Sequence, residues 1–540
     1  MPSKTPLLPS RQLLLCIRYA PVTANRFDVA IVGMGPVGAV ASLLFGHAGL
    51  KVVAIEKDAE VYTMPRAVNL DGEMVRHFQP LGLAQEVNAL LQPLREGERA
   101  GFGNSRREWL FGQTAVHFGP NGWQPGNMFD QPQLETYFRQ KAISQPGVTT
   151  MIGRQLVAFQ DHADHVSLAL DNGEQLAASY LLGCDGAASF VRKTLGIGWQ
   201  DLGYNHQWLV VDVQMIKAHQ LPNEVMQVCD PQRIHTYVAT KEPFRRWEFK
   251  LNAGEQAADM LDEEQVRSLL DPWTPRDTYN IRRKAVYEFH AATADRWQAG
   301  RVLIAGDAAH QTPPFLGQGM NAGLRDVVNL AWKLPLIVTG KAAADLLATY
   351  EQERLAHAHD LVDWAVSFGH LMEHLASAEA AALAGQPAPP PPAAMQTSGY
   401  GQGRDQPPLR AGALVLSQVS DTGLTGYLFR QPLVRDQAGN ECLLDELLGG
   451  GFSIVGSSAA ALVTSERHRP LLSLLGIRKV DWSLLTPVQG RFDEALAAVD
   501  ALIVRPDRIV YGHTEAGLGL DDLLQQLAQA LYLTGIVPDG

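Results

Sequence analysis

Residues 26–58 read RFDVAIVGMGPVGAVASLLFGHAGLKVVAIEKD, and this stretch decides the fold. FDVAIV and KVVAIE are short apolar runs rich in β-branched residues, which predicts two buried strands. Pro36 stands where the first residue of a helix belongs, and Gly49 closes that helix. A strand, a helix and a second strand in this order predict a parallel sheet with a right-handed crossover.

The loop between the first strand and the helix has the spacing GxGxxG, with Gly33, Gly35 and Gly38. The first glycine permits a tight turn, the second lets the backbone approach a pyrophosphate, and the third lets helix and strand pack closely. The positive end of the helix faces the negative charge. Glu56 ends the second strand, where its carboxylate can accept hydrogen bonds from an adenosine ribose. The pattern predicts a dinucleotide site and leaves FAD and NAD both open.

Residues 306–326, GDAAHQTPPFLGQGMNAGLRD, form a second glycine-rich bend between a strand and a helical pattern. Asp307 directly follows the strand and suits a sugar-alcohol chain, which FAD has and NAD lacks. Gly317 and Gly319 surround a helix start whose free N–H groups would stabilise an anionic reduced flavin. We expect Pro335 to kink or end this helix. The bend favours FAD; a loop kept glycine-rich only for packing is the alternative.

Asp185 and Gly186 follow a third apolar strand, YLLG, and precede the helical pattern SFVRK. They place a second carboxylate at an end of the sheet. Taken alone, Asp185 is equally well explained as the cap of the helix that follows.

The rest of the chain predicts further units. Alternating apolar and polar residues in the middle of the chain predict an antiparallel sheet inserted into the nucleotide-binding domain. A proline- and glycine-rich stretch after a long helical pattern (344–372) marks a domain boundary. The expected units are a disordered leader (1–26), a nucleotide-binding domain (27–372) with an inserted sheet (about 204–292), a linker (384–408) and a small α/β domain (409–540).

Composition narrows the function classes. The chain has 540 residues and a formal net charge of −12, which argues against a nucleic-acid-binding surface. Its four cysteines form no CxxC pair, so neither a metal site nor a dithiol centre is expected. No apolar run reaches the length of a membrane span, and Arg18 interrupts the one near the N-terminus. We therefore expect a cytoplasmic protein.

The three motifs in this order, GxGxxG, then DG, then GDAAH…PP…G.G.N.G, resemble the FAD-dependent aromatic hydroxylases, the group A flavoprotein monooxygenases. PRAVNLDGEMVRHFQPLGL (65–83), FDQPQLE (129–135) and GCDGAASFVRKTLGI (183–197) are most similar to members that hydroxylate 3-(3-hydroxyphenyl)propionate. The resemblance implies an α/β fold with a Rossmann-like FAD-binding domain, an inserted antiparallel-sheet substrate domain and a C-terminal thioredoxin-like domain. That last domain lacks a CxxC, so a structural or oligomerising role, with a homodimer possible, is expected.

The resemblance also implies roles for single residues. Asp185 and Gly186 would serve both FAD and the nicotinamide cofactor, and Asp307 would bind the ribityl hydroxyls. Pro314 would lie beside the flavin with its carbonyl near the substrate. The remaining contacts implied for FAD are Arg66 in the loop after the second strand, Gln131 near the ribityl or pyrophosphate region, and the backbone around Gly317, Gly319, Met320 and Asn321 at the pyrimidine ring.

The reaction implied is hydroxylation of a phenolic substrate by O₂ and NADH or NADPH through a flavin C4a-hydroperoxide, without a metal. The inserted sheet would cover the flavin and exclude water. Candidates to assist the phenol are Tyr237, Arg246, His290 and His310. Each has a structural alternative: strand packing for Tyr237, a solvated face for Arg246, and a structural hydrogen bond for the histidines. Other flavin chemistry (halogenation, epoxidation, dehydrogenation) and a non-catalytic flavin- or ligand-binding protein are the alternative functions.

Overall fold

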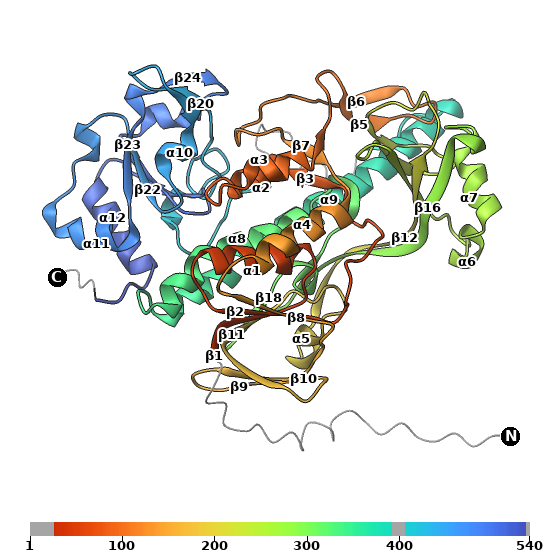
Figure 1. The fold of residues 1–540 in the computed structure, drawn as a ribbon. Coiled ribbons are helices and arrows are strands. Elements are labelled where there is room, and N and C mark those ends of the chain that lie inside the picture. Colours follow the sequence, from red (N-terminus) through yellow and green to blue (C-terminus); the bar gives the residue numbers. More distant parts are fainter. Residues whose placement is uncertain (1–25, 391–405, 536–540) are drawn as a thin grey trace.

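The computed structural model describes residues 26–390 and 406–535 (Figure 1). Nearly all of the expected leader (1–26) and most of the expected linker (384–408) lie outside these residues. The chain forms three parts: a mainly parallel sheet with helices, a second and mainly antiparallel sheet whose strands are interleaved with those of the first along the chain, and a C-terminal α/β part.

The first sheet contains the predicted parallel strands at its centre, and β9, β10 and β17 add antiparallel pairs to it. Its central strand β1 pairs in parallel with β2 on one side and β11 on the other. The segments 165–186 and 301–309 return to this sheet as expected, because β18 pairs in parallel with β11. The strands are β1 (Arg26–Val32), β2 (Val52–Glu56), β8 (Val148–Ile152), β9 (Leu156–Asp161), β10 (Val166–Leu170), β11 (Gln175–Gly183), β17 (Gln298–Ala299) and β18 (Val302–Ile304).

Helices cover this sheet on the face shown uppermost in Figure 1. Helix α1 (Pro36–His47) begins at the proline marked by the sequence, and Gly49 follows its end with a φ of 84°. Both predictions are confirmed. Helices α4 (Gln131–Ile143) and α8 (Gly319–Val338) pack beside α1. Smaller elements of this part are α2 (Gly72–His77), α3 (Ala84–Ala89), α5 (Phe190–Thr194) and a three-stranded sheet of β3 (Asn69–Asp71), β4 (Gln92–Pro93) and β7 (Gly126–Met128).

The expectation that Pro335 ends α8 is wrong, because the helix runs three residues beyond it to Val338. A proline removes one N–H donor, but the next turn still closes: the Thr339 N–H donates to the Pro335 carbonyl at 3.1 Å. Helix α9 (Ala348–Leu383) then begins near the predicted position and continues to the start of the expected linker.

The second sheet is antiparallel except at one strand pair, and it is larger than predicted. It begins before residue 204, ends after residue 292, and includes the hairpin of β5 and β6 from earlier in the chain. β5 joins because it pairs in parallel with β13, a long-range pairing that local pattern does not reveal. The strands are β5 (Arg99–Gly103), β6 (Trp109–Thr114), β12 (Trp199–Met215), β13 (Val225–Val228), β14 (His235–Val238), β15 (Phe244–Lys250), β16 (Tyr279–Ala294) and β19 (His310–Gln311).

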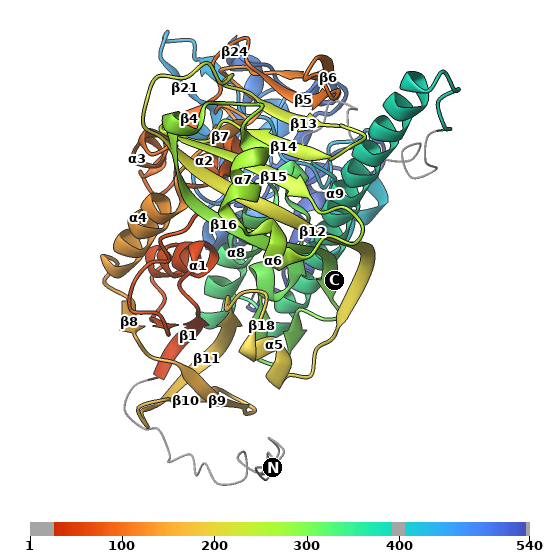
Figure 2. The ribbon, with the colours of Figure 1, turned by 90° about the vertical axis from the view of Figure 1, so that its right-hand side faces the viewer.

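Helices α6 (Ala257–Met260) and α7 (Glu263–Leu270) cover the outer face of this second sheet (Figure 2). Val266 and Leu270 of α7 pack there with Leu209, Tyr237 and other apolar side chains of the sheet. The opposite face of the sheet is turned toward the first domain.

The C-terminal part holds a mixed four-stranded sheet in the order β23-β22-β25-β26. Its two strands on either side of a Pro-Asp turn and its last helix are where the sequence predicted them. The elements are β20 (Leu433–Arg435), β21 (Glu441–Leu443), α10 (Leu444–Leu448), β22 (Ser453–Gly456), α11 (Arg469–Leu475), β23 (Arg478–Asp481), β24 (Thr486–Gln489), β25 (Ala501–Val504), β26 (Val510–His513) and α12 (Leu520–Ala530).

Buried ion pairs join the C-terminal part to the first domain. Arg76 of α2 donates two hydrogen bonds of 2.7 Å to Asp445, which Arg508 also approaches at 3.0 Å. Arg505 contacts Glu353 of α9 at 2.8 Å. Figure 1 shows the C-terminal part beside α2 and the far end of α8.

Candidate functional site

A cavity of about 1700 Å³ runs from the GxGxxG loop to the second sheet and α9. Pockets for one small ligand usually measure about 300–1,000 Å³, so this space is large enough for a dinucleotide and a second molecule. One end is lined by Gly33, Gly35 and Glu56, and the other by Phe289 and Leu371.

Gly33 and Gly38 make the tight turn and the close packing that their spacing predicts. Gly33 has a φ of 93°, and a Cβ there would lie 2.5 Å from the Cys184 carbonyl oxygen. A Cβ on Gly38 would overlap the carbonyl oxygen of Gly33. Gly35 differs, because a Cβ there would meet no atom within 4 Å and would point into open space. The turn therefore leaves a cradle in front of α1.

Glu56 is held at the end of β2 and lines the cavity. Its carboxylate accepts hydrogen bonds from the Met34 N–H at 2.7 Å and the Asp58 N–H at 2.9 Å. Arg139 of α4 lies 3.7 Å from Glu56 and donates to the Met34 carbonyl at 2.7 Å. The sequence analysis did not find Arg139; its only signal was an i,i+4 spacing from Glu135, which is a common surface pattern.

Asp185 lines the cavity and also supports the start of α5, although the cap of that helix is Ser189. Its carboxylate accepts from the Ser189 hydroxyl at 2.5 Å and from the Val191 N–H at 3.0 Å, which fixes the start of α5. It also lines the cavity together with Gly186, whose φ is 76°.

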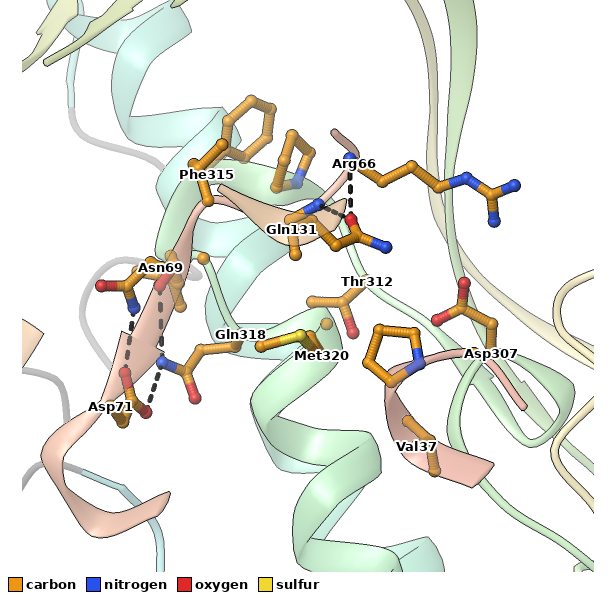
Figure 3. A pocket seen from close by; sticks show the side chains of 18 of the residues that line it. Val37, Arg66, Asn69, Asp71, Gln131, Asp307, Thr312, Phe315, Gln318 and Met320 are labelled. Atoms are coloured by element: carbon orange, nitrogen blue, oxygen red, sulfur yellow. Dashed lines mark hydrogen bonds between the residues drawn. The ribbon is translucent and has the colours of Figure 1, made fainter. Parts of the chain in front are cut away.

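At the other glycine-rich bend, buried amides hold the loops that line the cavity (Figure 3). The Gln131 side-chain oxygen accepts from the N–H groups of Arg66 and Ala67, both at 2.8 Å. Asn321 does not line the cavity; it accepts from the Asp71 N–H at 3.0 Å and donates to the Gly317 carbonyl at 2.9 Å. Asn321 is therefore a positioning residue.

The bend itself presents backbone to the cavity. Gly317 has a φ of 62°, and α8 starts two residues later at Gly319. Figure 3 shows Met320 of this first turn facing the same space as Asp307 and Thr312. A helix N-terminus at this place offers unpaired N–H groups and a partial positive charge.

Asp307 points into the cavity (Figure 3). Within the described part of the chain, no residue hydrogen-bonds its carboxylate. Desolvation by the surrounding protein raises the pKa of the Asp307 carboxyl group, and electrostatic interactions with His310 and Arg66 lower it. Asp307 is exposed to the open cavity, so its carboxylate can accept from a ligand there, and a chain of hydroxyl groups supplies such donors. This residue and the glycine cradle fit FAD.

Three of the four residues expected to assist the substrate lie outside the cavity. Tyr237 points to the outer face of the sheet, where it donates to the Pro222 carbonyl at 2.7 Å. His310 is buried, binds Asp326 at 2.8 Å and stacks on Trp297. His290 is exposed and binds Asn205 at 2.8 Å. The structural alternatives describe all three.

Arg246 does line the cavity, but its solvated-face alternative is wrong. It is buried and makes two hydrogen bonds to Asp212, at 2.7 and 3.1 Å. It also donates to the Arg66 carbonyl at 2.7 Å and the Pro65 carbonyl at 3.1 Å. With these donors engaged, Arg246 holds the loop of Arg66 and leaves no free fork for a substrate carboxylate.

The glycine cradle, the unpartnered carboxylate and the helix N-terminus around one cavity define the class: a flavoprotein that binds FAD. The family model described as FAD binding domain matches residues 26–365, and the one described as HcaD C-terminal domain matches residues 426–530. The chain belongs to the family of FAD-dependent aromatic hydroxylases, and it is an FAD-dependent monooxygenase that uses NAD(P)H.

Two relatives agree with this assignment, and a solved structure shares the fold. A 3-(3-hydroxy-phenyl)propionate/3-hydroxycinnamic acid hydroxylase of Klebsiella pneumoniae is 34% identical over 81% of this chain and 79% of its own. Its counterpart in Burkholderia vietnamiensis is 32% identical over 91% and 94%. The fold is that of aklavinone-11 hydroxylase in complex with FAD and aklavinone, with a TM-score of 0.77 at 24% identity over 94% of this chain and all of the other. No helix in the described ranges could span a membrane.

Replacing Asp307 with alanine is expected to weaken FAD binding by about 1.5–3 kcal/mol, a factor of about 10 to 150, because hydrogen bonds to a charged group are lost. Flavin fluorescence during dilution of the holoenzyme measures this affinity. An Asp307→Asn variant should lose less than the alanine variant. An alanine variant that retains flavin as the unmodified protein does would remove the assignment of Asp307.

Proposed function

We propose that the protein adds a second hydroxyl group to a phenol of the 3-(3-hydroxyphenyl)propionate type. The relatives named above support this substrate class. Support from the fold comes from the cavity, which continues past the flavin-side bend into a chamber between the second sheet and α9. Phe102, Phe289, Leu371 and Leu375 line that chamber and suit an aromatic ring.

The residues at one end of the cavity would bind the cofactor, and those at the other end would bind the substrate. Bound FAD supplies the redox chemistry, taking electrons from NAD(P)H and activating O₂. The turn at Gly33 and Gly35 and the carboxylate of Glu56 would hold the adenosine and pyrophosphate, and Asp307 the ribityl chain. Pro314 lines the cavity between the two ends and would set the floor of the substrate site. The apolar chamber above it excludes water from the reacting atoms.

Arg283 of β16 is the cation we assign to the substrate carboxylate. It lines the cavity, where one terminal nitrogen donates to the Pro65 carbonyl and lies 3.7 Å from the Asp212 carboxylate. Unlike Arg246, it keeps further N–H donors free among the described residues. A guanidinium with free donors binds a carboxylate through charge-assisted hydrogen bonds.

A panel of phenols tests the proposal. With NADH or NADPH, O₂ and 3-(3-hydroxyphenyl)propionate, we expect accelerated oxidation of the nicotinamide and a catechol product identified by mass spectrometry. The matching 3-methoxy compound, which has no phenolic proton, should give no hydroxylated product. If no phenol of the panel either accelerates NAD(P)H oxidation or gains an oxygen atom, the proposal fails.

We also propose that residues 409–540 form a thioredoxin-like domain with a structural role. Its support is the strand order β23-β22-β25-β26, in which β22 and β23 are parallel and β25 and β26 form an antiparallel hairpin before α12. The domain limits 27–372 and 384–408 are proposed with it. Because the reaction draws on NAD(P)H, we place the enzyme in the cytoplasm.

A further inference from the structure

Glu248 of β15 is a buried carboxyl group that faces the substrate chamber. Side chains of β15 alternate: Trp247 and Phe249 enter the apolar core on the outer face, and Glu248 lines the cavity. Its opposite neighbours in the sheet are Val210 on β12 and Thr236 on β14. The residue is only 5% exposed, and the surface that it does expose faces the chamber.

Glu248 has no hydrogen-bond donor among the described residues. Its nearest cation is Arg246, at 3.7 Å, and that guanidinium is already bonded to Asp212. Burial raises the pKa of the Glu248 carboxyl; Asp212 adds to the rise, and Arg246 and Arg283 oppose it. A buried acceptor that the protein leaves unsatisfied beside a ligand chamber is a candidate for ligand contact.

Glu248 belongs to a polar row that crosses the roof of the chamber toward the flavin side. Thr236 follows it on β14, and Gln227 lies opposite Thr236 on β13. The Thr236 hydroxyl donates to the Gln227 side chain at 2.5 Å, and Gln227 donates to the Phe315 carbonyl at 3.4 Å. Phe315 is next to Pro314, so the row ends where the flavin-side bend begins.

We propose that Glu248 accepts the hydrogen bond of the substrate's phenolic hydroxyl and takes its proton during hydroxylation. This rests on the proposed function. The O–H bond breaks, its electron pair stays on the phenol oxygen, and the proton moves to a Glu248 carboxylate oxygen. The ring carbon next to the C–O bond, now richer in electrons, receives the oxygen atom that O₂ and NAD(P)H supply through FAD. Glu248 then returns its proton to the same oxygen, and the ring carbon loses its hydrogen as a proton to water.

The test compares Glu248→Gln with Glu288→Gln, which makes the same charge change at an exposed site on β16. We expect Glu248→Gln to retain FAD and phenol-stimulated NADH oxidation, to hydroxylate on the order of 100-fold more slowly with little change in KM, and to release more H₂O₂. Fluorine on the ring lowers the pKa of the phenol, so the defect should shrink along a fluorinated series. The hydroxylation rate of Glu248→Gln should rise with pH as the substrate itself ionises.

Several results would overturn the inference. Glu248→Gln could show the rate and pH profile of the unmodified enzyme, or its defect could be equal for every phenol in the series. A Glu248→Asp variant keeps a carboxylate, so it should hydroxylate faster than Glu248→Gln, and an equal rate would count against the inference. If Glu248→Gln does not fold, a folded Glu248→Asp variant without measurable hydroxylation would count against it. If the unmodified enzyme hydroxylates no phenol, the proposed function fails instead.

Discussion

Replacing Glu353 with glutamine is expected to lower the free energy of unfolding by about 3–5 kcal/mol, because a buried charge network loses its centre. The Glu353 carboxylate accepts from Asn329 at 2.6 Å, Lys333 at 2.9 Å and Arg505 at 2.8 Å. Lys333, Glu353 and Arg505 are each 0% exposed. With a neutral amide at position 353, two buried cations share only Asp507.

The pH dependence follows from the same contacts. Burial alone would raise the pKa of Glu353, but Arg505 and Lys333 lower it to about 2. A carboxyl group with a lowered pKa in the folded state contributes stability above its ordinary pKa of about 4.5 and loses it as the pH falls toward 2. The glutamine variant should therefore lose less stability than the unmodified protein over that acidic range.

Urea unfolding followed by circular dichroism measures both effects. The matched control is Glu466→Gln on the C-terminal domain, where the side chain is 84% exposed and a change within about 0.5 kcal/mol is expected. Because Arg505 belongs to the C-terminal domain and Glu353 to α9, the loss should appear first as separate unfolding of that domain. Equal midpoints for Glu353→Gln and Glu466→Gln would contradict the prediction.

The residues that we assign to the FAD end of the site could be predicted from the sequence because the geometry of that end is local. Gly33, Gly35 and Gly38 act within one strand–turn–helix unit, and the protein backbone leaves no room for a Cβ at Gly33 or Gly38. The position of Asp307 is also set locally, because this residue is the second of the glycine-rich bend. Backbone conformation at such positions depends on near neighbours, so a single stretch of sequence contains the information.

The substrate end depends on which face of each strand meets the cavity. Because side chains alternate between the two faces, a shift of one residue along a strand exchanges them. On β14 the alternation puts Thr236 on the cavity face and Tyr237 on the outer face. Both faces of the sheet are buried, so hydrophobicity does not tell them apart. A signal was present on β15: Arg246 and Glu248 are two residues apart and therefore share a face, so Arg246 at the cavity implies Glu248 there.

A pair of glycine substitutions separates folding from cofactor binding. Gly38→Ala is expected to destabilise the apoprotein by about 3 kcal/mol, at the upper end of what overpacking costs, because the new Cβ overlaps the rigid backbone of Gly33. The backbone shift also opens the cradle, so FAD binding should fall on the order of 100-fold or more, since each 1.4 kcal/mol lost is a factor of ten.

Gly35→Ala is the matched control. Gly35 has a φ of −61° and a ψ of −177°, which alanine adopts without strain, and its Cβ would meet no protein atom within 4 Å. The apoprotein should unfold within about 0.5 kcal/mol of the unmodified chain. The methyl group would occupy space that we assign to the FAD pyrophosphate, so FAD binding alone should weaken. If Gly35→Ala binds FAD with unchanged affinity, the pyrophosphate does not lie over this turn; if Gly38→Ala is as stable as Gly35→Ala, the close packing of α1 on β1 is not what the third glycine provides.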